Sequence, residues 1–132
     1  MPERVRKDGG FTLLELIVVM AIIGILAGIA LPQYKVAIIQ AKEAVLKEDL
    51  FRFRDVIDQY QADKGSYPAS LQALLESGYL RHIPNDPMTN APDWEVVEAE
   101  PDPDYPGEPP GIYDVHSAST GTSLSGTPYN EW

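Results

Sequence analysis

The sequence contains no cysteine, so no disulfide bond can contribute to the fold. Basic residues are missing from the C-terminal part, because all 10 Lys and Arg occur up to Arg81 whereas half of the 20 acidic residues follow it. Such a surface repels phosphate groups, which argues against nucleic-acid binding. Two interpretations of the acidic part remain open, a solvated surface or a surface that attracts metal ions.

Sequence motifs of catalytic sites are also missing. Neither a G-x-S-x-G nucleophile motif nor an H-E-x-x-H metal motif occurs. The two histidines, His82 and His116, stand alone and are interpreted as ordinary surface or capping residues. We therefore predict that the protein is not an enzyme.

An uninterrupted apolar run extends from Phe11 to Leu31 and contains a single charge, Glu15. A soluble amphipathic helix would carry polar residues every three or four positions. A run of ~20 apolar residues is long enough to cross the hydrocarbon core of a membrane. The alternative is a fully buried core helix, which a chain of this size could hardly surround. The run therefore predicts a membrane-spanning helix.

The segment before this helix, MPERVRKDGG, is polar and basic and ends in two glycines. A secretory signal would place its small residues after the apolar stretch rather than before it. Glu15 costs ~2.5–3.5 kcal/mol inside a membrane unless it finds a partner, which makes it a functional candidate. The arrangement GFTLLE resembles the class III signal of type IV pilins and pseudopilins. This resemblance implies cleavage between Gly10 and Phe11, methylation of the new Phe11 amine, and pairing of that amine with Glu15, usually of a neighbouring subunit.

Small residues and a proline interrupt the apolar helix at defined places. Gly24 and Gly28 form a GxxxG pattern that allows close approach of neighbouring helices, although it also fits a merely weaker helix. Pro32 cannot donate a backbone hydrogen bond, which predicts a kink or local unwinding there. In filaments of the family, the segment between these positions can lose helicity on assembly.

The pattern changes to an amphipathic helix from Gln33 to about Lys64. Apolar residues step by four, three, four and three, which gives one stripe that faces a core: Leu46, Leu50, Phe53, Ile57 and Tyr60. Gly65 is expected to end the helix. Counted from Phe11, the two parts predict one helix about 80 Å long.

Residues 65–132 predict a small head. Ser70 is placed to cap a short helix over 71–77 that Gly78 closes. The segments 94–98 and 112–116 predict two strands, separated by an acidic, proline-rich loop. Trp132 is expected to pack under the last loop as an anchor. The fold class is therefore α+β, with a long N-terminal helix packed on a head that contains a short antiparallel sheet.

The head resembles the major pseudopilin of type II secretion in the segments KGSYPASLQALL, GYLRHIPNDPMTN and YDV. Met88 stands where that family has Trp, and no glycine precedes Asn90. The resemblance implies a structural subunit of a filament that drives protein export across the outer membrane. It also implies as partners other copies of the chain, minor pseudopilins, a prepilin peptidase and an assembly platform in the bacterial inner membrane. The expected division is a leader (1–10), a membrane and filament-core helix (11–32), an amphipathic helix (33–64) and a periplasmic head (65–132).

Calcium is the cofactor that the resemblance raises. Major pseudopilins bind it in the last loop through aspartates and backbone carbonyls. The corresponding positions here, Ser117, Thr120 and Ser125, carry no carboxylate. Calcium prefers six to eight oxygen ligands with several carboxylates. We therefore do not expect a strong calcium site in this loop.

Two other functions are compatible with parts of the sequence. A surface pilus used for adhesion, motility or electron transfer would share the class III signal. A signal-anchored periplasmic binding module would share the apolar helix, but it would leave Gly10 and Glu15 unexplained.

Overall fold

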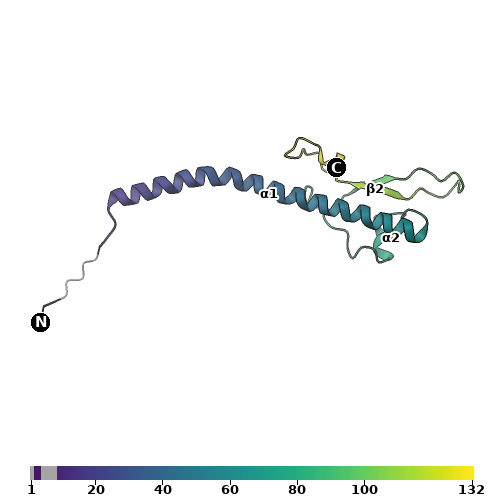
Figure 1. The fold of residues 1–132 in the computed structure, drawn as a ribbon, viewed down its shortest axis with the longest axis horizontal. Helices are drawn as coiled ribbons and strands as arrows, with labels where there is room; N and C mark the ends of the chain where they lie inside the picture. Colours follow the sequence, from purple (N-terminus) through teal and green to yellow (C-terminus); the bar gives the residue numbers. More distant parts are fainter. Residues whose placement is uncertain (1, 4–8) are drawn as a thin grey trace. The chain divides into compact units, whose positions relative to one another are not determined.

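The structure is a computed structural model that describes residues 2–3 and 9–132. The elements follow the order α1 (Leu13–Lys64), α2 (Leu71–Glu76), β1 (Glu95–Glu98), β2 (Ile112–His116) and the short 3₁₀ helix η1 (Tyr129–Glu131). The chain divides into two compact units, Met1–Ile38 and Ile39–Trp132. The α+β class predicted from the sequence is confirmed (Figure 1).

Helix α1 continues through Pro32 without a break in its helical backbone. The local unwinding predicted at this proline is therefore wrong for the single chain. Pro32 removes only the one hydrogen bond that its missing N–H would donate, and the flanking residues carry the helix past it. The helix ends as predicted at Gly65, whose positive φ of 75° is accessible to glycine without strain.

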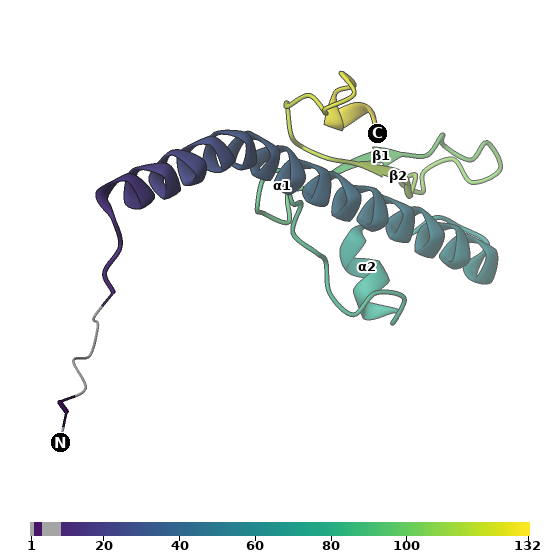
Figure 2. The same ribbon diagram turned by 60° about the vertical axis from the view of Figure 1, so that its left-hand side comes forward.

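In the second unit, α1 supplies most of the core. Leu46, Leu50, Phe53 and Ile57 of the predicted stripe are buried, Val56 joins them, and Tyr60 packs at the margin. Figures 1 and 2 show this part of α1 with the two-stranded sheet on one side and α2 on the other. The predicted stripe is thus the surface around which the head is built.

Helix α2 is short and owes its bounds to its caps. The Ser70 hydroxyl accepts a hydrogen bond from the Ala73 amide at 3.2 Å. At the other end, the Tyr79 amide donates to the Leu74 carbonyl at 2.9 Å and Gly78 has a φ of 80°. This is the Schellman arrangement, in which a left-handed residue closes the helix. Both predicted caps are confirmed.

Strands β1 and β2 pair antiparallel, with Glu95 opposite His116 and Val97 opposite Asp114. The register is irregular between Val97 and Glu98. Just before β2, a Cβ on Gly111 would lie 2.5 Å from the Tyr67 carbonyl oxygen. Only glycine allows this approach, which brings the Ile112 amide to 2.7 Å from the Pro68 carbonyl oxygen. The start of β2 is thereby fixed to the segment that follows α1.

The core closes on an aromatic pair. The rings of Phe53 and Trp94 meet edge to face with centroids 5.0 Å apart, and Trp94 donates its indole N–H to the Pro84 carbonyl oxygen at 2.7 Å. Phe53 is 1% exposed, so its ring is surrounded on all sides. The loop that precedes β1 is thus attached to α1.

Phe53→Ala should destabilise the head by about 3–5 kcal/mol, because it removes a buried ring and leaves a cavity. Phe51→Ala is the matched control, since Phe51 lies on the same helix but is 68% exposed; it should change the free energy of unfolding by less than about 0.5 kcal/mol. Denaturant unfolding of the full chain in detergent, followed by tryptophan fluorescence, measures both. Equal losses for the two variants would contradict this assignment of the core.

Candidate assembly site

The N-terminal end of α1 is closed by a reciprocal cap. The Glu15 amide donates to the Thr12 hydroxyl at 3.2 Å, and the Thr12 amide lies 3.4 Å from a carboxylate oxygen of Glu15. This is a capping box, which satisfies two backbone donors at the helix start. This role of Thr12 was not predicted, although the Thr-x-x-Glu spacing is that of a capping box.

Glu15 remains available for a stronger partner. Its side chain is exposed, and the contact with the Thr12 amide is long for a hydrogen bond. A carboxylate can accept several hydrogen bonds at once. Phe11 lies four residues earlier, just before α1 begins, and is 92% exposed. The two residues of the predicted pair, Phe11 and Glu15, therefore both lie exposed at the start of the helix.

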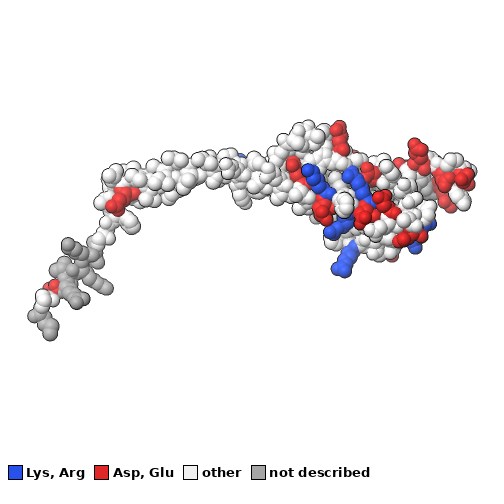
Figure 3. Space-filling model, viewed as in Figure 1, with Lys and Arg blue, Asp and Glu red and all other residues white. Residues whose placement is uncertain are grey.

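The apolar half of α1 has no cover within the described chain. All residues from 11 to 38 are exposed, and the helix is long and apolar enough to cross a membrane. No described atom outside the local backbone lies within 4 Å of a Cβ built on Gly24 or Gly28, so this face is open to a neighbouring helix. Figure 3 shows the almost uncharged surface of this segment in white. Such a surface must be covered by lipid or by other helices.

The three positions at which the resemblance placed a calcium site are not brought together. Ser117 is buried and its hydroxyl donates a hydrogen bond to the Asp86 carboxylate, whereas Thr120 is exposed. Ser125 belongs to a cluster of hydroxyls with Ser123 and Thr127. Within the described ranges, no group of three or more His, Asp or Glu side chains could hold a metal ion. The residues present do not fit calcium.

A direct contact with α1 holds this loop. One carboxylate oxygen of Glu43 accepts hydrogen bonds from the Leu124 amide and from the Tyr129 hydroxyl, each at 2.9 Å. Burial, and then the hydrogen bond to Glu43, raises the pKa of Tyr129 above its ordinary value of 10.0, so the hydroxyl stays a neutral donor. Nothing in the local sequence indicated Glu43, because its partners lie more than 80 residues away.

Trp132 closes the other side of the loop, as predicted. Its indole N–H donates to the Thr127 hydroxyl at 2.8 Å, and its ring meets Tyr129 with centroids 5.3 Å apart. Its carbonyl oxygen accepts from Arg54 of α1 at 2.5 Å. The Arg54 Nε also donates to Asp114 of β2 at 2.8 Å. The loop is thus tied to α1 at Glu43 and at Arg54.

A class III signal motif before an uncovered apolar helix, together with this α+β head, defines the class of pilin-like proteins. Comparisons with known proteins agree. Residues 5–31 match the family described as "Prokaryotic N-terminal methylation motif". No solved structure matches the chain.

Two relatives illustrate the closer similarity. The chain is 36% identical over 101 residues to the type II secretion system core protein G of Pseudomonas aeruginosa, covering 64% of this chain and 71% of the relative. It is 32% identical over 128 residues to the core protein G of Escherichia coli, covering 85% and 81%. The chain belongs to the family of type II secretion system core protein G, the major pseudopilins.

The loop contacts predict that a calcium chelator leaves the melting temperature of the full chain unchanged. A bound ion at a hundredfold excess over its Kd would add ~2.7 kcal/mol of stability, which the chelator would remove. Glu43→Gln should lower the melting temperature, because it weakens two hydrogen bonds to a charged acceptor. Glu48→Gln is the matched control, since this side chain is 67% exposed. A chelator-induced drop of several degrees would contradict the absence of a calcium site.

Proposed function

We propose that this protein is a structural subunit of the type II secretion pseudopilus, made as a precursor and assembled into a filament. The observation that carries the proposal is the uncovered apolar half of α1, which contains one carboxylate, Glu15, near its start. Membership of the core protein G family supports the same assignment. The contribution of the subunit is mechanical rather than catalytic, and the energy for assembly comes from other components.

Processing is the first step of the proposed pathway. The leader, residues 1–10, stays on the cytoplasmic side and a prepilin peptidase removes it after Gly10. The cleavage leaves an amine on Phe11, which is then methylated. The match of residues 5–31 to a methylation motif supports this step. The apolar helix remains in the product and anchors it in the inner membrane, with the head, residues 65–132, in the periplasm.

Assembly then replaces lipid contacts with contacts between helices. The charge of Glu15 is costly in the membrane, and the Phe11 ammonium of a neighbouring copy is the partner proposed for it. Gly24 and Gly28 allow neighbouring helices to approach closely, because their Cβ positions are open. Pro32 marks a point where α1 lacks one backbone hydrogen bond and can adjust to the filament. The further partners proposed are minor pseudopilins and the inner-membrane assembly platform.

Gly10→Val should block removal of the leader, because the peptidase reads a residue without a side chain at this position. The chain would be co-expressed with the peptidase and its mass measured after membrane extraction. The wild-type product should begin at Phe11 and the variant should retain residues 1–10. Gly9→Val is the control and should be processed. A wild-type product that begins elsewhere would overturn the proposed cleavage site.

Glu15→Val should insert into the membrane at least as well as the wild type but form no filaments. The substitution removes the charge that opposes insertion and the group proposed to pair with Phe11. Glu15→Gln is the control for the cap, because an amide still accepts from the Thr12 amide but carries no charge; it should also fail to assemble. Membrane fractionation and electron microscopy of the same cells measure both properties. Filaments of normal number from Glu15→Val would contradict the role of this carboxylate.

A further inference from the structure

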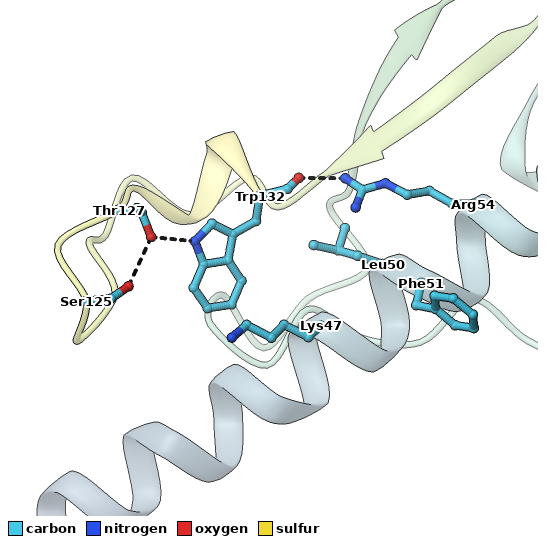
Figure 4. Close-up of a pocket in the computed structure, with 7 residues that line it drawn as sticks. All are labelled: Lys47, Leu50, Phe51, Arg54, Ser125, Thr127 and Trp132. Atoms are coloured by element: carbon cyan, nitrogen blue, oxygen red, sulfur yellow. Dashed lines mark hydrogen bonds between the residues drawn. The ribbon is translucent and has the colours of Figure 1, made fainter.

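A groove of about 440 Å³ opens on the head between α1 and the last loop. Figure 4 shows its lining, in which Lys47, Phe51 and Arg54 come from α1 and Trp132 lies opposite them. The lining contains two cations and no acid, although the chain has a net charge of −10. Because the charge of Arg54 is compensated by Asp114, the groove presents one uncompensated cation, Lys47, beside an aromatic wall.

Two of these lining residues are free to bind a ligand. Arg54 is engaged with Asp114 and with the Trp132 carbonyl oxygen. The Lys47 ammonium lies 4.8 Å from the ring centroid of Trp132, and among residues 9–132 no carboxylate forms an ion pair with it. Phe51 is 68% exposed. The groove thus presents a cation beside an exposed aromatic ring, which suits a ligand with carboxylates around an aromatic side chain.

The loop between β1 and β2 has both features of such a ligand, carboxylates and an aromatic side chain. It contains four acids and no cation, and all of the acids are exposed: Glu100, Asp102, Asp104 and Glu108. Tyr105 belongs to the same loop and is 64% exposed. Five prolines between residues 101 and 110 restrict the backbone of the loop. The Asp102 carboxylate also accepts a hydrogen bond from the Asp104 amide at 2.9 Å. The prolines limit the conformations open to the free loop, which reduces the conformational entropy that it would lose on binding.

In the structure, the loop lies away from the groove of its own chain. It lines a separate cavity with Gln61, Gly65 and Tyr67, at the end of α1. Phe51 lies ten residues before Gln61, which is about 15 Å along the helix. Figure 3 shows acidic side chains gathered at one end of the head and, nearer its middle, basic side chains with further acidic ones among them. The groove of one chain is therefore open to the loop of another copy.

We infer that in the filament the acidic loop of one subunit, residues 100–108, docks in the Lys47–Phe51 groove of a neighbouring subunit. This inference rests on the proposed function. The two surfaces differ, so the contact is head to tail, and repetition of such a contact produces an open helical filament. Both partners are exposed to solvent, so salt weakens the contact.

The absence of native cysteine allows a direct test in assembled filaments of the full chain. Phe51→Cys combined with Tyr105→Cys should give a ladder of disulfide-linked multimers on a denaturing gel after oxidation, whereas each single variant should not. A disulfide requires Cα atoms within about 7 Å, which excludes a bond within one chain. The control pair, Phe51→Cys with Tyr113→Cys, places the second thiol on an exposed tyrosine of β2 outside the loop and should give no ladder.

Charge reversal in the same double-cysteine background tests the electrostatic part. Lys47→Glu should reduce the ladder at least fivefold, and addition of Asp104→Lys should restore it. Lys42→Glu is the control, because this exposed lysine lies on another face of α1, about 140° around the helix. Filaments that require Glu15 but give no ladder, or a ladder unaffected by Lys47→Glu, would overturn the inference alone. Failure of the wild-type chain to form filaments would overturn the proposed function and the inference with it.

Discussion

The structure depends on one constraint, which is that the apolar half of α1 has nothing to cover it within the described chain. Every residue from 11 to 38 is exposed, and the only charge before Lys35 in that range is Glu15. Before assembly, lipid can satisfy the apolar side chains but not the carboxylate. After assembly, helices of other copies can satisfy both, provided that a cation reaches Glu15. With the proposed pairing of Glu15 and Phe11, the cost of an unpaired charge would favour the assembled state.

The head obtains most of its core from the second half of α1. The stripe from Leu46 to Ile57 forms the core, while Glu43 and Arg54 of the same helix hold the last loop. The loop is therefore anchored to α1 by hydrogen bonds. Because these contacts come from α1, the geometry of the loop is coupled to the helix that enters the filament. The groove beside Lys47 lies at the same junction.

Local patterns in the sequence predicted the elements that local interactions determine. The apolar stripe, the Ser70 and Gly78 caps and both strands follow from periodicity and capping preferences, and the structure confirms them. The contacts of Glu43 and Arg54 could not be predicted, because each joins residues at least 60 positions apart. The Thr12 cap could have been predicted from the Thr-x-x-Glu spacing, but Glu15 was interpreted only as a charge in the membrane. At Pro32, the helix continues because the residues on both sides favour the helical conformation.

A structure of the assembled filament, at a resolution that shows side chains, tests the central claim most directly. The quantity to measure is the distance between the Phe11 nitrogen of one subunit and the Glu15 carboxylate of its neighbours. The account predicts a separation of about 4 Å or less, in the range of an ion pair. A Glu15 that contacts only Thr12 of its own chain, with every Phe11 nitrogen well beyond that range, would contradict it.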